Sequence, residues 1–141
     1  MFRILNKSIF KQNEKIEYKV NLDKNILYEG KYLNGKRWNG KGKEYYDNGK
    51  LIFEGEYLNG ERNGKGKEYN WNGKLRFEGE YLNGKKWNGK GFNKNGKKEF
   101  EIKNGNGKVK EYNRNDELEF EGEYLNGERN GKEMNIMIMV N

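Results

Sequence analysis

Residues 53–60 read FEGEYLNG, and this phrase decides the fold because it returns along the chain. It recurs unchanged twice and once as the near copy YEGKYLNG, at 77–84, 120–127 and 28–35. A shortened copy, FEIKNG, begins at Phe100, so that the leading aromatic residues are 25, 24, 23 and 20 residues apart. Self-similarity at a period of roughly 20 to 50 residues is the signature of a repeat array. We therefore expect five units over residues 28–132, the fourth of them degenerate.

The opening strand of each unit alternates between two kinds of residue. Phe53, Gly55 and Tyr57 fall on one face, and Glu54 and Glu56 fall on the other. The same phase holds in the other complete units, at Tyr28, Gly30 and Tyr32, at Phe77, Gly79 and Tyr81, and at Phe120, Gly122 and Tyr124. The glycine between two rings leaves a flat gap. We expect an aromatic ring of the neighbouring hairpin to lie against the backbone there.

Asparagine–glycine pairs mark the turns between strands. Of the 20 glycines, 13 follow an asparagine, and this dipeptide supplies the positive φ angles of a tight type I′ hairpin. The chain has no alanine, and no apolar stripe of helical period persists in it. The sequence therefore predicts an all-β fold, an elongated single-layer meander of stacked β-hairpin repeats. Residues 1–27 are expected to form an N-terminal cap with an extra strand at 16–22.

The repeated phrase resembles a known family. YEGKYLNGKRWNGKG at 28–42 and its echoes are similar to the MORN repeat, in which an aromatic residue, Glu-Gly and a second aromatic residue are followed, after a turn, by Gly-x-Gly. This chain has Asn where many members of the family have His before the second turn glycine. The resemblance implies an elongated sheet of hairpins and a non-catalytic role in scaffolding, dimerisation, or attachment to partner proteins or anionic lipid.

The absence of Cys and His excludes much enzyme chemistry. It removes disulfides, thiolate or imidazole metal sites, and a histidine general base. Glutamates two residues apart resemble a glycosidase pair, but they recur in the complete units, as Glu54 with Glu56, Glu78 with Glu80, and Glu121 with Glu123. A motif copied in this way is structural, and we expect cross-strand pairing with Lys41, Lys43, Lys65 and Lys67. We predict no enzyme activity, no metal and no cofactor.

Basic residues are concentrated in 85–110, a segment with nine lysines and two acidic residues. With one aromatic residue from the same segment, the candidate anion-binding or lipid-binding residues are Lys85, Lys86, Trp87, Lys90, Lys94, Lys97, Lys98, Lys103, Lys108 and Lys110. Lysines interleaved with aromatic residues can bind the phosphates of lipid headgroups or of single-stranded nucleic acid. Because lysine lacks the bidentate fork of arginine and the net charge of +7 is modest, we rank lipid above nucleic acid. The alternative is that the lysine excess reflects A/T-rich codons.

Two tryptophans are candidates for partner binding. Trp38 and Trp87 occupy equivalent turns, RWNGKG and KWNGKG, two repeats apart. A row of exposed tryptophans along one sheet edge would suit a protein partner or an interfacial membrane contact. The alternative is that each tryptophan folds back over its own hairpin.

The tail at 133–141, EMNIMIMVN, matches none of the repeat phrases. Written in A/T-rich codons and read from Gly131 with two bases removed, this end becomes KGNEYNDNGK, which is close to KGKEYYDNGK at 41–50. We therefore hypothesise that the tail is an out-of-frame remnant of a sixth repeat. The alternative is a methionine-rich edge strand or partner-binding tail.

These observations favour a non-catalytic scaffold that binds a protein partner, with anionic lipid contact through 85–110. Two alternatives stay open: an antitoxin or immunity-type inhibitor of the bacterial variant-MORN kind, and a nonfunctional fragment of a longer array. Open sheet edges favour a homodimer. No run is long and apolar enough for a signal peptide or a membrane span, so we expect a cytoplasmic protein, peripheral to the membrane where lipid is bound.

Overall fold

The structure is a computed structural model that describes residues 2–11, 14–21, 26–33, 36–37 and 39–130, with side chains described over 39–130. The described residues form strands and turns and no helix, which confirms the all-β prediction. The strands are β1 (Phe2–Lys11), β2 (Glu14–Asn21), β3 (Ile26–Leu33), β4 (Lys36–Arg37), β5 (Gly40–Tyr45), β6 (Leu51–Leu58), β7 (Glu61–Tyr69), β8 (Leu75–Leu82), β9 (Lys85–Phe92), β10 (Lys98–Ile102), β11 (Gly107–Tyr112), β12 (Leu118–Leu125) and β13 (Glu128–Arg129).

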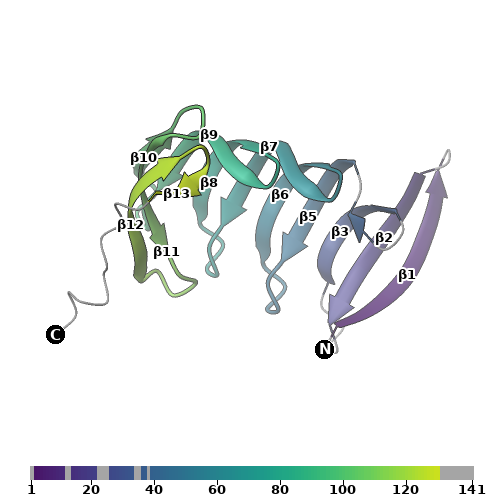
Figure 1. Cartoon of the computed structure of the whole chain (residues 1–141). Helices are drawn as coiled ribbons and strands as arrows, with labels where there is room; N and C mark the ends of the chain where they lie inside the picture. The colour runs from purple at the N-terminus through teal and green to yellow at the C-terminus, as the bar shows by residue number, and fades with distance from the viewer. Residues whose placement is uncertain (1, 12–13, 22–25, 34–35, 38, 131–141) are drawn as a thin grey trace.

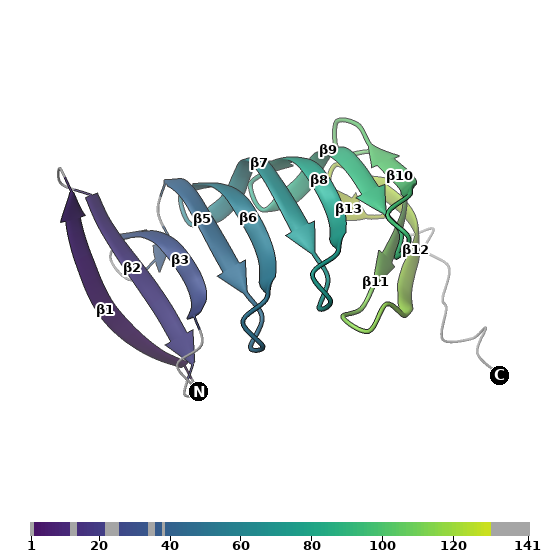
Figure 2. The same ribbon diagram turned by 180° about the vertical axis from the view of Figure 1, so that it is seen from behind.

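The strands follow one another as an antiparallel meander. The long sheet has the order β1-β2-β3-β5-β6-β7-β8-β9-β10, with the short β4 paired to β3. A second sheet, β11-β12-β13, follows at the C-terminal end. Figure 1 shows the strands side by side as a curved band, and Figure 2 shows the same band from behind. The expected elongated, single-layer meander of hairpins is confirmed. Residues 16–21 of the strand predicted at 16–22 lie in β2, and Leu22 lies outside the described residues.

A row of glycines crosses the long sheet at right angles to the strands. Each glycine lies opposite the next in the antiparallel register, in the order Gly42, Gly55, Gly66, Gly79 and Gly89. Aromatic rings cover this row, since a Cβ atom built on Gly66 would lie 2.5 Å from Cε1 of Phe53. The expected gap is therefore filled, mainly by the leading aromatic of the same hairpin, with the ring of Tyr81 from the next hairpin at 3.1 Å.

The core is a line of rings that runs from unit to unit. Its buried members are Phe53, Tyr57, Phe77, Tyr81, Ile102, Val109 and Phe120. Phe53 meets Tyr81 of the next unit edge-to-face, with ring centroids 5.2 Å apart, and Tyr81 meets Phe77 of its own unit at 5.7 Å. Since each unit buries its rings against the following one, stability depends on contacts between neighbouring units.

Glutamates and lysines alternate across the opposite face. In one row Lys67 lies opposite Glu54 on one side and opposite Glu78 on the other. The row continues on both sides, through Lys43 and Glu29 and through Lys90 and Glu101. We call this row the Glu–Lys ladder. Opposite charges across strands contribute roughly 0.2–1 kcal/mol per pair, which gives the repeated carboxylates the structural partners that the sequence predicted.

The two edges of the band have different turns. Asn59 and Gly60, with φ of 51° and 84°, form the predicted type I′ turn, and the turn at 83–84 repeats it. The prediction is wrong for the opposite edge. There Asp47, Asn48 and Gly49 form a three-residue loop in which only the glycine has a positive φ, because the amides of Tyr46 and Gly49 bond to the carbonyls of Lys50 and Tyr46.

Asparagine side chains join the type I′ turns of successive units. The backbone N–H of Asn59 donates a hydrogen bond to the side-chain Oδ1 of Asn39 at 2.9 Å. The backbone N–H of Asn83 donates in the same way to Oδ1 of Asn63 at 3.0 Å. The same bond recurs with Asn104 and Asn88, and with Asn126 and Asn106. Each bond satisfies the turn amide of the following unit, so the asparagine before the second turn glycine is a link between units.

Candidate functional site

Two phrases are each shorter by two residues, one at the end of the third unit and one at the start of the degenerate fourth unit. KGFNKNG at 90–96 stands where the preceding unit has KGKEYNWNG at 65–73, and FEIKNG at 100–105 stands where the preceding unit has FEGEYLNG. The long sheet ends at β10, and a single bridge between Lys103 and Asn106 continues toward β11. The shortened strands β9 and β10 therefore coincide with the break between the two sheets.

The break also replaces the glycine row by aliphatic side chains. Ile102 pairs with Gly89 where a further glycine of the row is expected, and Val109 takes the matching place in β11, opposite Gly122. Both side chains are fully buried, at 1% and 2% exposure. They fill the volume that aromatic rings fill elsewhere, so the core continues across the break.

A repeated polar cluster lies at the ring face of the regular units. Arg62 packs 4.1 Å above the ring of Phe53, and its Nε lies 2.8 Å from the carboxylate of Glu44, which also accepts the hydroxyl of Tyr57. The cluster recurs as Glu111, Tyr124 and Arg129, with bonds of 2.6 and 3.2 Å to the carboxylate. The corresponding set is Glu68, Tyr81 and Lys86, in which Lys86 lies 3.2 Å from Glu68 but the hydroxyl of Tyr81 has no hydrogen-bond partner among the described residues. Because the cluster is copied, we interpret it as structural.

Charges around Glu68 outweigh its burial. Burial alone would raise the pKa of this carboxyl, but Lys86 at 3.2 Å and Arg62 at 2.6 Å hold the pKa below its ordinary value. Glu68 is therefore ionised and fully engaged. The third unit has no counterpart of this glutamate, because Gly91 lies opposite Phe77 where Glu68 lies opposite Phe53.

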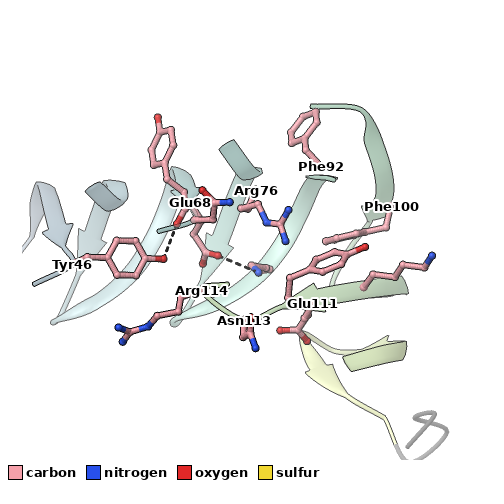
Figure 3. A pocket seen from close by; sticks show the side chains of 13 residues that line it. Tyr46, Glu68, Arg76, Phe92, Phe100, Glu111, Asn113 and Arg114 are labelled. Carbon is pink, nitrogen blue, oxygen red and sulfur yellow. Dashed lines mark hydrogen bonds and ion pairs between the residues drawn. The ribbon is translucent and has the colours of Figure 1, made fainter. Parts of the chain in front are cut away.

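A cleft of about 160 Å³ opens between β7–β9 and β11 (Figure 3). Four cationic and two acidic side chains line it, namely Arg76, Lys86, Lys110, Arg114, Glu68 and Glu111. Both carboxylates already have cationic partners, in Lys86 with Arg62 and in Arg129. Small-molecule sites usually have a volume of roughly 300–1,000 Å³. The cleft therefore has room for one side chain or a small anion, in a positive field.

Arg76 is the singular residue of the cleft. It directly precedes the leading aromatic Phe77, at the place where Ile52 precedes Phe53. Its guanidinium lies 4.3 Å above the ring of Tyr112, and its Nη2 lies 3.5 Å from the carboxylate of Asp116. Its side chain is 13% exposed, and among the described residues neither terminal nitrogen has a hydrogen-bond partner. Arg76 thus carries a positive charge, and its Nη1 and Nη2 groups donate no hydrogen bond to the described residues.

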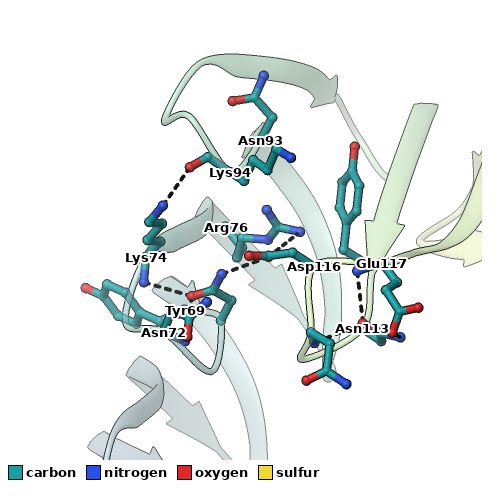
Figure 4. A network of polar contacts seen from close by, with 12 residues as sticks. Tyr69, Asn72, Lys74, Arg76, Asn93, Lys94, Asn113, Asp116 and Glu117 are labelled. Atoms are coloured by element: carbon teal, nitrogen blue, oxygen red, sulfur yellow. Dashed lines mark hydrogen bonds and ion pairs between the residues drawn. The ribbon is translucent and has the colours of Figure 1, made fainter.

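Asp116 holds Arg76 from a strained backbone position. Three other turns of this edge in the described part of the chain have Gly49, Gly73 and Gly96 at the matching place, whereas Asp116 adopts a φ of 62°. This left-handed conformation costs an ordinary residue roughly 1–2 kcal/mol. Its carboxylate accepts a hydrogen bond of 2.9 Å from Nδ2 of Asn70, as Figure 4 shows beside the ion pair with Arg76. Asp116 therefore ties the turn between β11 and β12 to the turn between β7 and β8.

Aromatic and arginine side chains form the mouth of the cleft. Arg114 lies 4.7 Å from the ring of Trp71, and Trp71 packs edge-on against Tyr46 at 5.3 Å. On the inner side Tyr112 donates a hydrogen bond of 2.6 Å to Glu99, and burial together with this bond raises the pKa of Tyr112 to about 12. Tyr112 is therefore a neutral, fixed wall beside Arg76.

The predicted lysines are divided among several surroundings. Four are ion-paired: Lys85 with Glu128 at 2.7 Å, Lys86 with Glu68, Lys98 with Glu101 at 3.0 Å, and Lys110 with Glu99 at 3.6 Å. Two face carboxylates by register, Lys90 in the Glu–Lys ladder and Lys108 opposite Glu123. The remaining Lys94, Lys97 and Lys103 are exposed in turns and have no ion pair with the described residues. The structure does not bring the segment together as one basic surface.

A smaller basic surface does form at one turn, and we call it the basic tip: Lys74, Lys94 and Lys97. Lys74 reaches across from the previous turn and donates a hydrogen bond of 3.1 Å to the carbonyl of Lys94. A shallow hollow beside them is lined by Leu75 and Phe92. Cations around an apolar hollow are suited to an anionic lipid surface.

The two tryptophans predicted to bind a partner are Trp38 and Trp87. Trp38 lies outside the described residues. Trp87 is half-buried, and its ring covers Gly105, where a Cβ atom would lie 2.7 Å from Cζ3. It packs on the turn of the next unit, so its role in partner binding stays a prediction. Sequence reasoning did not single out the exposed leucines of the type I′ edge, Leu58, Leu82 and Leu125.

Sequence reasoning also missed the cleft residues Arg76, Arg114 and Asp116. The available signal was aspartate in place of glycine at 116, since the position of Arg76 varies along the chain and holds Leu27, Ile52, Glu99 and Glu119 in the other units. Their proximity could not be read from the sequence, because the contact between Asn70 and Asp116 spans 46 residues and depends on the break between the sheets.

No family model matches this sequence, and no curated protein matches it. The resemblance to MORN repeats rests on the repeated phrases. The described part of the chain contains no group of three or more acidic, His or Cys side chains placed to hold a metal ion. It also contains no helix of the length and apolar character needed to cross a bilayer.

Proposed function

We propose that this chain is a non-catalytic, MORN-type repeat scaffold that binds a protein partner at the cleft between its two sheets. One observation carries the proposal: the repeated glutamates of the polar cluster are ion-paired within the array, whereas Nη1 and Nη2 of Arg76 at the cleft have no hydrogen-bond partner among the described residues. A feature present once in an array is a better candidate for function than one copied in its units.

The size and lining of the cleft favour a protein over a metabolite. Its volume of about 160 Å³ accepts a single side chain, and Trp71, Tyr46 and Arg114 flank its mouth. Tryptophan, tyrosine and arginine are the residues enriched at the energetic centres of protein interfaces. A partner would insert one side chain and rest on this aromatic rim.

The test is affinity capture with three versions of the intact chain. The cleft variant is Arg76→Gln with Arg114→Gln, and the control is Lys43→Gln with Lys67→Gln, which removes the same charge from the Glu–Lys ladder. We expect the wild type and the control to recover one protein in stoichiometric amount, and the cleft variant to lose it. Equal recovery by all three versions, or no stoichiometric partner for the wild type, contradicts the proposal.

The identity of the captured protein separates the scaffold from the inhibitor alternative. A toxic enzyme whose activity falls on binding would make this chain an antitoxin or immunity protein. A membrane or cytoskeletal component would make it a scaffold.

A second function, contact with anionic lipid, is favoured by the basic tip. Lys94 and Lys97 have no ion pair with the described residues, and Lys74 lies beside them at the apolar hollow. We expect salt-sensitive co-sedimentation with vesicles of phosphatidylserine and phosphatidylcholine that is weakened by Lys94→Gln with Lys97→Gln. Lys85→Gln with Lys98→Gln, two lysines already paired with Glu128 and Glu101, is the control of equal charge and is expected to bind as the wild type. Equal loss in both variants contradicts a specific role of the tip.

A further inference from the structure

We infer that the cleft recognises a carboxylate of the partner, an acidic side chain or a chain terminus, through the guanidinium of Arg76. The inference rests on the proposed function, because it names the chemical group by which the protein partner is held. It commits to a peptide carboxylate and not to phosphate.

Arg76 has hydrogen-bond donors that the folded chain does not satisfy. Its side chain is only 13% exposed, yet Nη1 and Nη2 have no hydrogen-bond partner among the described residues. A buried charged donor without an acceptor is costly. The planar fork of a guanidinium matches the two oxygens of a carboxylate. Both nitrogens are enclosed, so a carboxylate that enters with a shift of the surrounding side chains satisfies what the folded chain leaves unsatisfied.

The second argument is the position of Asp116. Its carboxylate lies 3.5 Å from Nη2 of Arg76 and also accepts the bond from Asn70. That distance is too long for a good charge-assisted hydrogen bond, which is roughly 2.7–2.9 Å. Asp116 therefore steadies the guanidinium without using its donors, and it acts as a weak competitor for the same cation.

The third argument is the match of charge and shape. Glu68 and Glu111 already have cationic partners and Arg76 has Asp116 at 3.5 Å, so the cations that a carboxylate meets here are Arg76 and Arg114. One negative charge on a planar group fits beside the ring of Tyr112, over which Arg76 lies at 4.3 Å. A phosphate dianion is bulkier, and it is repelled more strongly by Asp116 and by the two glutamates of the cleft.

Two single substitutions in the cleft are expected to act in opposite directions on carboxylate affinity. Arg76→Gln removes the guanidinium, and we expect affinity to fall at least tenfold, roughly the value of a charged hydrogen bond. Asp116→Asn removes the competing charge, tolerates the left-handed φ and keeps an acceptor for Asn70, and we expect affinity to rise roughly threefold to tenfold. A residue that served only to hold the turns together would weaken binding in both variants.

The measurement is isothermal titration of the intact chain with three probes. They are a blocked peptide of alternating glycine and glutamate, an oligoglycine with a free C-terminal carboxylate, and inorganic phosphate. We expect one or both peptides to bind more tightly than phosphate and to follow the opposite shifts of the two variants. Binding to Lys43→Gln with Lys67→Gln is expected to equal that of the wild type, and thermal melting of every variant checks that it is folded.

Several results would overturn the inference. These are binding that is unchanged in Arg76→Gln, shifts in the same direction for both cleft variants, phosphate binding tighter than either peptide, and no binding of any probe. The failure of the inference and that of the proposed function are distinguishable. A partner lost in the Arg76 and Arg114 variant while no carboxylate binds leaves the scaffold standing and removes the carboxylate. Carboxylate binding as expected in a chain that captures no protein upholds the site and removes the scaffold.

Discussion

The hairpin β7–β8 and the hairpin β9–β10 have the same turn and different strands. Asn70 and Asn93 each accept two backbone amides of their own turn, at 2.9 to 3.0 Å. The second hairpin nevertheless has one residue fewer before Asn93 than the first has before Asn70, and two residues fewer after its turn. Because side chains alternate with a period of two, the loss of two residues after the turn keeps Ile102 in the same core as Phe100. The comparison teaches that strand length can change at constant turn chemistry, and that this change ends the long sheet.

The largest expected effect on stability belongs to the leading aromatics. Phe53 in a regular unit is fully buried at 0% exposure, whereas Phe100 of the degenerate unit is only partly buried. We expect Phe53→Ala to lower the free energy of unfolding by about 3–5 kcal/mol and Phe100→Ala to lower it by clearly less. Urea denaturation of both variants measures the difference. An equal loss would mean that the degenerate unit is packed as tightly as the regular one.

The glycine row supplies the next largest effect. In Gly66→Ala the added methyl meets the ring of Phe53 at 2.5 Å, so ring or strand must move. We expect a loss of about 1–3 kcal/mol in the free energy of unfolding. Val109→Ala, at the matching place in β11, is the counterpart, since there a side chain fills the row and its removal leaves a cavity. Gly66→Ala without measurable loss would show that the rings do not depend on bare backbone.

Acid titration sharpens the contrast at Glu68, the residue that the shorter hairpin lacks. Its pKa in the folded chain lies below the ordinary value of 4.5, so its stabilising effect is complete above that pH. The effect is lost as the pH falls through the lower, folded pKa. We expect Glu68→Gln to cost about 1–2 kcal/mol at pH 7 and to reduce the dependence of the melting temperature on pH below pH 5. An unchanged acid profile in this variant would contradict the account.

The smallest expected effect on stability belongs to the cleft. Arg76→Ile gives the second unit the residue that the first unit has at position 52. Replacing a buried, weakly paired charge by an apolar side chain is often neutral or stabilising, and we expect a change within about 1 kcal/mol. Differential scanning calorimetry measures it. A large loss of stability would make Arg76 a structural member of the fold and would weaken its assignment to partner binding.

The fold was predictable because its signals are local and repeated. Phe53, Gly55 and Tyr57 fix the ring face by period alone, and Asn59 with Gly60 fixes a type I′ turn by the φ angles that these two residues tolerate. The three-residue loops were not predicted, because Asn48 with Gly49 is the same dipeptide in a different loop length. Local composition does not distinguish the two turn types, and the pairing of the flanking strands decides between them.

The cleft was not predictable, because its residues meet only after the sheet is interrupted. Asp116 is visible in the sequence as an exception to the repeat, but the repeat gives no distance between it and Arg76. The lysine-rich segment shows the converse. Its composition suggests one basic surface, yet strand alternation and cross-strand pairing assign Lys86, Lys90 and Lys98 to three different carboxylate environments.

The asparagine bonds between type I′ turns have a mechanical consequence. Along that edge backbone amides of one unit are fastened to the next, and the amides of Gly84 and Gly127 add bonds of 2.8 Å to carbonyls of Arg62 and Gly105. At the opposite edge neighbouring turns meet mainly through side chains, such as Tyr46 on Trp71. We therefore expect the band to be stiffer along the edge of the type I′ turns than along the opposite edge. Bending should change the spacing of units mainly at that opposite edge.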